Sequence, residues 1–150
     1  LINLKFIEMQ RLKGTDNPTI KAQFISLNEE IFELIQKINY DDNKQIKGEI
    51  LINLERYDEA LDYFKGKNNF KKCGIVLIKK KEYENALSYF IKGKEYSFAI
   101  SCLIEIKNYP RLYDFLLEFK EEFDLEHIQY FYKITCDKFF KKYMIPIKGI

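Results

Sequence analysis

Aromatic residues recur at intervals of 13 along the middle of this 150-residue chain, at Tyr57, Phe70, Tyr83, Tyr96 and Tyr109. Three residues after each aromatic comes a small or apolar side chain, and this second column consists of Ala60, Cys73, Ala86, Ala99 and Leu112. A third column lies seven residues after each aromatic and consists of Phe64, Leu77, Phe90, Leu103 and Leu116. Spacings of three and seven residues place side chains on one face of an α-helix, whereas a strand needs a period of two. The repeat therefore predicts a series of short helices, one for each aromatic residue of the first column.

Helices of this length depend on their neighbours for stability. Each has about nine helical residues, and isolated helices shorter than about 12 residues are marginal in water. Short connections make successive helices antiparallel, so that two of them form a hairpin of about 26 residues. A stack of hairpins in which each contacts only its neighbours is an α-solenoid. We expect an all-α fold, namely a right-handed α-solenoid of short antiparallel hairpins with the three columns packed between helices.

The same register continues more weakly toward the N-terminus, through units that begin at Pro18, Ile31 and Lys44. Asn17 is a suitable N-cap and Pro18 a suitable first helical residue. Gly66 and Gly93 follow their helices, where a left-handed cap residue is favoured. We expect a leading helix and turn in residues 1–17, eight short helices in residues 18–118, and a longer C-terminal helix in residues 119–150 that caps or continues the stack.

The composition is that of an ordinary folded domain. An aromatic content of 16% with a net charge of +2 argues against disorder. No apolar run is long enough to cross a membrane, and no leader follows the first residue. Three cysteines without a C-x-x-C pair indicate a reducing compartment. We therefore expect a cytoplasmic protein, and the first residue, Leu1, suggests a piece of a longer chain.

The segments 57–61, 83–87 and 96–100, which read YDEAL, YENAL and YSFAI, carry a family resemblance. Residues 44–118 resemble the tetratricopeptide-like solenoids of vesicle-coat and intraflagellar-transport subunits, and they are similar to the clathrin-type repeats of vacuolar sorting proteins. The expected hairpin is shorter than the regular tetratricopeptide repeat of about 34 residues, and the chain has no tryptophan. The resemblance implies a protein-interaction scaffold within a large assembly.

Signatures of catalysis are scarce. The chain has no phosphate-binding glycine motif and no H-E-x-x-H zinc motif. His127 is the only histidine, and its neighbours lack the spacing of metal ligands. Cys73 belongs to the small column, which predicts a buried thiol, and Cys102 and Cys136 have no evident basic activator. We expect no enzyme activity, cofactor or metal; an unrecognised enzyme centred on His127 is the least favoured alternative.

Lysines are abundant, and clusters such as 71–72 and 79–81 suggest an anionic partner. However, 25 basic residues nearly balance 23 acidic ones, so no positive field covers the whole domain. We therefore do not expect nucleic acid as a partner, and we expect membrane contact to be at most indirect. We favour a non-catalytic α-solenoid segment of a coat, tether or intraflagellar-transport subunit, whose partners are other protein subunits. The alternative is an adaptor that holds a short peptide or client tail in a concave groove, with four candidate residues: Lys44, Lys47, Asn68 and Lys71.

Overall fold

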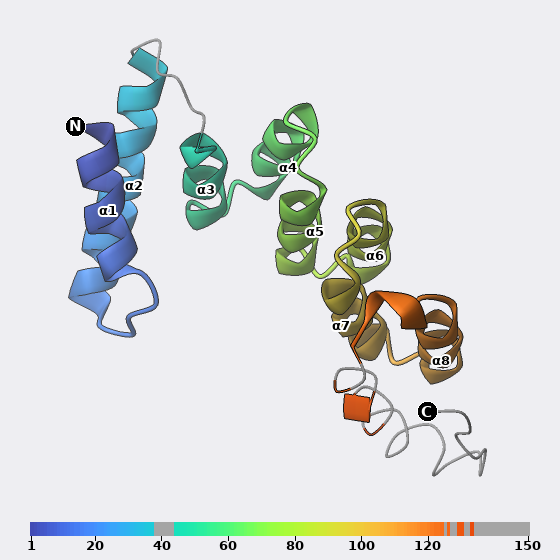
Figure 1. The fold of residues 1–150 in the computed structure, drawn as a ribbon. Coiled ribbons are helices and arrows are strands. Elements are labelled where there is room, and N and C mark those ends of the chain that lie inside the picture. Colours follow the sequence, from blue (N-terminus) through green and yellow to red (C-terminus); the bar gives the residue numbers. More distant parts are fainter. Residues whose placement is uncertain (38–43, 125, 127–128, 131–132, 134–150) are drawn as a thin grey trace. The chain divides into compact units, whose positions relative to one another are not determined.

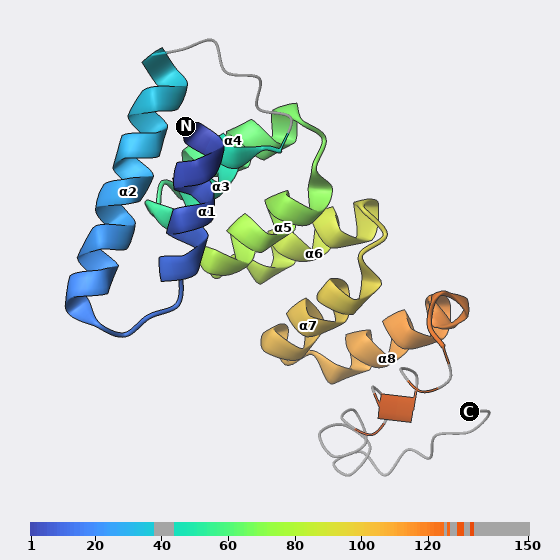
Figure 2. The same ribbon diagram turned by 60° about the vertical axis from the view of Figure 1, so that its left-hand side comes forward.

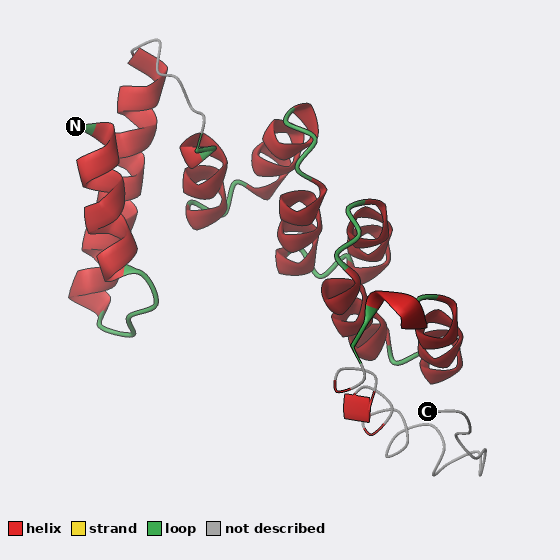
Figure 3. Ribbon diagram, in the orientation of Figure 1, coloured by secondary structure: helices red, strands yellow, loops and turns green. Residues whose placement is uncertain are grey.

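The computed structural model describes residues 1–37, 44–124, 126, 129–130 and 133. Throughout these residues the regular structure is helical and contains no strand (Figure 3). The predicted all-α class is therefore confirmed. The helices in chain order are α1 (Ile2–Leu12), α2 (Pro18–Lys37), α3 (Ile46–Asn53), α4 (Tyr57–Gly66), α5 (Phe70–Lys79), α6 (Tyr83–Lys92), α7 (Tyr96–Ile106) and α8 (Tyr109–Glu118), followed by the short 3-10 helix η1 (Lys120–Glu122) (Figure 1).

The chain divides into two compact units, and the boundary between Val76 and Leu77 falls inside α5. Within the first unit, α1 packs against α2, α2 against α3, and α3 against α4. Within the second unit, α7 packs against both α6 and α8 (Figure 2). Neighbours in sequence are therefore neighbours in space, as a repeat of short helices requires.

The period of the aromatic column marks the beginning of each helix from α4 to α8. Tyr57, Phe70, Tyr83, Tyr96 and Tyr109 are the first residues of these five helices. Two residues before each of them lies a residue with left-handed backbone, and these residues are Glu55, Asn68, Lys81, Lys94 and Lys107. Turn and helix start thus repeat together, which confirms the register predicted from the aromatic column.

The turns repeat because the same hydrogen bonds end the helices. At the end of α5, the amide of Lys81 donates to the carbonyl of Ile78 at 2.8 Å, and the amide of Glu82 donates to that of Leu77 at 2.9 Å. Equivalent pairs of bonds end α3, α4 and α6. This is the Schellman arrangement, in which two amides beyond the helix satisfy two of its last carbonyls. Leu77 belongs to the third column, so one residue both fills the core and anchors the turn.

Glycine does not occupy these left-handed positions, and our prediction for Gly66 and Gly93 was wrong. Gly66 is the last residue of α4, and Gly93 has a φ of −85°. The left-handed residues that follow them are Asn68 and Lys94. The left-handed residue is determined by the two hydrogen bonds of the turn, whose acceptors are carbonyls in the last turn of the helix. A lysine adopts the left-handed conformation at a cost of roughly 1–2 kcal/mol. The packing of the helices on either side of the turn imposes this conformation.

This cost leads to a prediction for the end of α7. Lys107 is exposed and has a φ of 63°, which glycine adopts without strain. We expect Lys107→Gly to raise the free energy of unfolding by about 0.5–1 kcal/mol. Glu105→Gly, two residues earlier in the helix and also exposed, should lower it by about 1 kcal/mol. Urea unfolding of both variants measures the difference, and a loss of stability in both would contradict the assignment of Lys107.

The N-terminal part follows the prediction only in part. The side chain of Asn17 accepts from the amide of Thr19 at 2.9 Å, and Pro18 begins α2, as expected. However, α2 continues for 20 residues through the site where a second unit was expected to begin at Ile31. No glycine or proline lies between residues 19 and 37, so nothing ends the helix there. The interval 18–118 therefore contains seven helices, as far as the structure describes it, rather than eight.

The third expected unit is displaced. Its first residue was predicted to be Lys44, but α3 begins at Ile46, after Gln45 with left-handed backbone. Beyond α8, the chain forms η1, and Phe123 has extended backbone. Most of the C-terminal helix predicted for residues 119–150 falls outside the described residues, so its existence stays a prediction. The expected leading helix is present as α1, and Gly14 follows it with a φ of 83°.

A buried asparagine connects the first three helices. Asn28 on α2 is fully buried, and its Nδ2 donates to the carbonyl of Phe24 at 2.6 Å. Its Oδ1 accepts from Nδ2 of Asn53, at the end of α3, at 3.0 Å. The same Nδ2 of Asn53 lies 3.4 Å from the sulfur of Met9 on α1. Hydrogen bonding thus satisfies a polar group that would otherwise be costly to bury.

We expect Asn28→Ala to lower the free energy of unfolding by about 2 kcal/mol, because it removes two hydrogen bonds and leaves the amide of Asn53 without its oxygen acceptor. Glu29→Ala is the matched control, since Glu29 is the next residue and is exposed; it should change stability by less than about 0.5 kcal/mol. Thermal unfolding monitored by circular dichroism compares the two. Equal effects would show that the hydrogen bonds do not stabilise this unit.

Candidate interaction surfaces

The three sequence columns occupy different depths. Every residue of the second and third columns has at most 2% of its surface exposed. The five aromatics of the first column are half-buried at the helix starts. The columns thus supply the interior of the units, and the surfaces open to a partner are formed by other residues.

One residue of the aromatic column, Tyr96, packs against other rings in the second unit. Tyr96 stacks on Phe119 with ring centroids 4.7 Å apart. Phe115 and Phe123 complete the cluster at 6.3 and 6.1 Å from Tyr96. Rings engaged with one another in this way provide no open platform for stacking nucleic-acid bases.

The candidate peptide-binding residues lie beside two contacts between α3 and α5. Nδ2 of Asn69 donates to Oε1 of Gln45 at 2.7 Å, and Lys72 forms an ion pair with Glu49. These contacts place the start of α3 next to the start of α5. Three of the candidates, Lys44, Asn68 and Lys71, are next in sequence to one of these contacting residues. The fourth, Lys47, is two positions from both Gln45 and Glu49. Lys44, Asn68 and Lys71 are exposed and Lys47 is half-buried. The two contacts join the sequence neighbours of the four candidates and not the candidates themselves.

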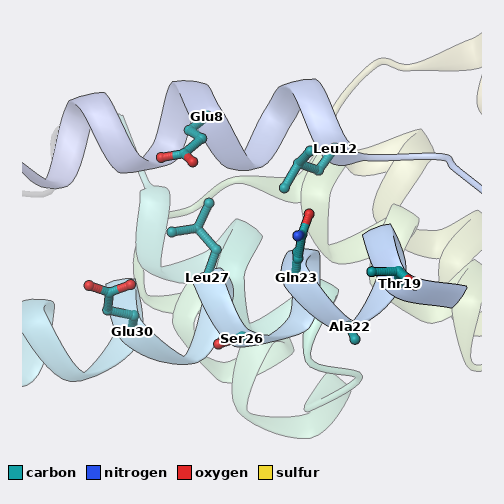
Figure 4. Close-up of a pocket in the computed structure, with 8 residues that line it drawn as sticks. All are labelled: Glu8, Leu12, Thr19, Ala22, Gln23, Ser26, Leu27 and Glu30. Carbon is teal, nitrogen blue, oxygen red and sulfur yellow. The ribbon is translucent and has the colours of Figure 1, made fainter. Parts of the chain in front are cut away.

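One groove of the first unit lies between α1 and α2 and has a volume of about 610 Å³ (Figure 4). Glu8 points from α1 toward α2, and Leu27 and Gln23 point from α2 toward α1. Glu30 at one end forms an ion pair with Lys5 at 2.7 Å. Most of the lining is polar and exposed, so this groove is an open depression rather than an enclosed pocket.

A second groove, of about 270 Å³, lies between α6 and α8. Its floor is apolar, and its edge carries two carboxylates, those of Asp114 and Glu118. At the start of the two helices, Nη1 of Arg111 lies 2.8 Å from both carboxylate oxygens of Glu84. The sequence periodicity did not reveal either groove, because it identifies the buried face of a helix but not which other helix lies beside it.

The described cysteines are unsuited to nucleophilic chemistry. Cys73 and Cys102 are fully buried. Burial raises the pKa of the Cys73 thiol, and burial together with the charge of Glu105 raises the pKa of Cys102 to about 11. Both thiols are therefore protonated at neutral pH, whereas the nucleophile is the thiolate. His127 and Cys136 lie outside the described residues.

In the described ranges, His, Cys, Asp and Glu side chains do not gather into a group of three or more that could hold a metal ion. Each helix of the same part of the chain is too short or too polar to cross a lipid bilayer. No protein-family model matches the sequence, and comparisons with curated proteins and with solved structures found no significant match.

Proposed function

We propose that this chain is a non-catalytic scaffold for protein–protein interaction, built as a right-handed α-solenoid of antiparallel helical hairpins. The observation that carries the proposal is the recurrence, at one constant interval from α4 to α8, of the helix start and of the left-handed turn residue before it. Helical repeats with the same turns and the same buried columns pack on their neighbours and offer long surfaces to other proteins.

Contacts between helices two apart in sequence support the stacking of hairpins. Arg111 and Glu84 join the start of α8 to the start of α6. In the first unit, Gln45 with Asn69 and Glu49 with Lys72 join the start of α3 to the start of α5. A stack of hairpins brings the starts of alternate helices together in this way, because alternate helices run in the same direction.

Spin labels at the turns of the second unit test the hairpin geometry. In a stack, Lys81 and Lys107 lie on one edge, whereas Lys94 lies on the opposite edge, a helix length of about 15 Å away. Cysteine pairs labelled at 81 and 107 should therefore show stronger dipolar broadening than pairs labelled at 81 and 94, although 94 is nearer in sequence. The reverse order would contradict the solenoid.

The wider setting follows from the resemblance of residues 44–118 to the solenoids of transport subunits. We propose that the chain is a segment of a larger cytoplasmic subunit of a coat, tether or intraflagellar-transport assembly, and that its partners are the other protein subunits. Quantitative affinity purification from its own cell tests this proposal. Several solenoid-containing proteins should be recovered in a fixed ratio, and recovery of a monomer alone would contradict the scaffold function.

A peptide-binding adaptor is the second candidate. It is favoured by the two contacts between α3 and α5, which join sequence neighbours of the candidates Lys44, Lys47, Asn68 and Lys71. Replacement of Lys44 and Lys71 by glutamate would abolish binding of an acidic tail by an adaptor. The same replacement should leave the subunit composition of a scaffold complex unchanged, so one purification distinguishes the two functions.

A further inference from the structure

The groove between α6 and α8 combines an apolar floor with an acidic edge. Its floor consists of Leu87 and Ile91 from α6, Leu103 from α7, Phe115 from α8 and Phe119 just beyond it. Ile91 has 36% of its surface exposed, so apolar surface of the floor is open to solvent. Burial of such surface against a partner favours binding, because it removes apolar atoms from water. The floor can therefore provide affinity for an apolar side chain.

The edge of the groove determines which partner fits. Asp114 and Glu118 lie four residues apart on α8, so their carboxylates share one face of the helix. Both are exposed, and neither has an ion-pair partner among the residues that the structure describes. The cation at this groove, Arg111, is already engaged by Glu84. The edge therefore favours a partner with basic side chains.

We propose that this groove binds an amphipathic helical segment of a partner protein, with branched apolar side chains on one face and lysine or arginine beside them. The apolar residues enter the groove over Ile91 and Phe119, and the basic residues pair with Asp114 and Glu118. A helix laid into an apolar groove is a common mode of peptide recognition. This inference rests on the proposed scaffold function and gives the chemistry of one of its partners.

The charges argue against other occupants. An acidic segment or a nucleic acid would be repelled by Asp114 and Glu118. A small apolar molecule would bury the floor but leave both carboxylates without partners. A basic amphipathic segment is the occupant that satisfies the floor and the edge together.

Fluorescence anisotropy with a defined probe tests the inference on the full chain. The probe is a short labelled peptide of Leu, Lys and Ala, with leucines at helical positions i, i+3, i+4 and i+7 and lysines beside them. We expect binding that weakens as salt is added. A peptide with glutamate in place of every lysine should bind at least about fivefold more weakly, because its charges meet those of the edge.

Two pairs of matched variants locate the binding. The double variant Asp114→Asn/Glu118→Gln should weaken binding about fivefold, whereas Glu105→Gln/Glu121→Gln, with the same change in net charge away from the groove, should alter it less than about twofold. Likewise, Ile91→Ala should weaken binding, whereas Leu117→Ala should not, since Leu117 is also exposed (43%) but does not line the groove.

Absence of binding, equal binding of the two peptides, or equal effects of matched variants would overturn the inference. Self-association that the groove variants abolish, measured by sedimentation, would also overturn it, in favour of a second copy of the chain as the occupant. None of these binding results decides the scaffold proposal, which is tested by purification from cells. Recovery of partner subunits from cells by the groove variants would show that the scaffold function holds even where the groove inference fails.

Discussion

Ala86→Arg should lower the free energy of unfolding by about 3–5 kcal/mol, a large share of the total for a domain of this size. Ala86 lies on α6 in the second column and is fully buried. A long side chain at this position must displace the neighbouring helix or leave its guanidinium without water and without a counter-charge. Because α6 packs on α7, we expect the whole second unit to be destabilised.

Asn85→Arg is the control for this prediction. Asn85 precedes Ala86 on the same helix but is exposed, so arginine there should change stability by less than about 0.5 kcal/mol. Both variants add the same side chain and the same charge. Urea unfolding monitored by circular dichroism should therefore separate them widely, and coincident curves would show that the second column does not lie between helices.

Phe64→Ala should have a comparable effect, about 3–5 kcal/mol, because it removes a fully buried ring and leaves a cavity. The ring lies against Gly48 on α3, where a Cβ atom would come within 2.7 Å of Cε1 of Phe64. Asp62→Ala, an exposed site on the same helix α4, should change stability by less than about 0.5 kcal/mol. Differential scanning calorimetry measures both variants.

The contact between Phe64 and Gly48 is itself testable by a double-mutant cycle. Gly48→Ala alone should cost about 1–3 kcal/mol, because the added methyl group meets a ring that is itself fully buried. In a Phe64→Leu background the same methyl group meets a smaller side chain, so Gly48→Ala should cost less there. An equal cost in both backgrounds would show that the ring does not restrict residue 48.

The sequence predicted α4 to α8 well because two independent signals coincide there. The apolar columns identify the buried face, and the polar turns separate the helices. In α2 the columns continue without a turn, and the expected break at Ile31 does not occur. The turns themselves were predicted at the right interval, but the left-handed conformation was assigned to Gly66 and Gly93, whereas Asn68 and Lys94 adopt it.

The interaction surfaces could not be predicted from the sequence. Each groove depends on a pair of helices, and hydrophobic periodicity describes each helix separately. The ion pair of Glu84 with Arg111 and the hydrogen bond of Gln45 with Asn69 connect residues far apart in sequence, with no pattern to mark them. Asn28 was missed for a related reason, because a buried asparagine and an exposed one look the same in a hydrophobicity pattern.

The shared turn also restricts how the length of this chain can change during evolution. Each turn ends one helix and starts the next with the same spacing, so gain or loss of a single helix with its turn leaves the later turns intact. In a stack of hairpins, however, such a change would move every later helix to the opposite side and exchange the surfaces that partners meet. Gain or loss of two helices with their turns would preserve both turns and surfaces. If the helices form such a stack, duplication by whole hairpins is the change in length that keeps the surfaces of the earlier and later helices on their original sides.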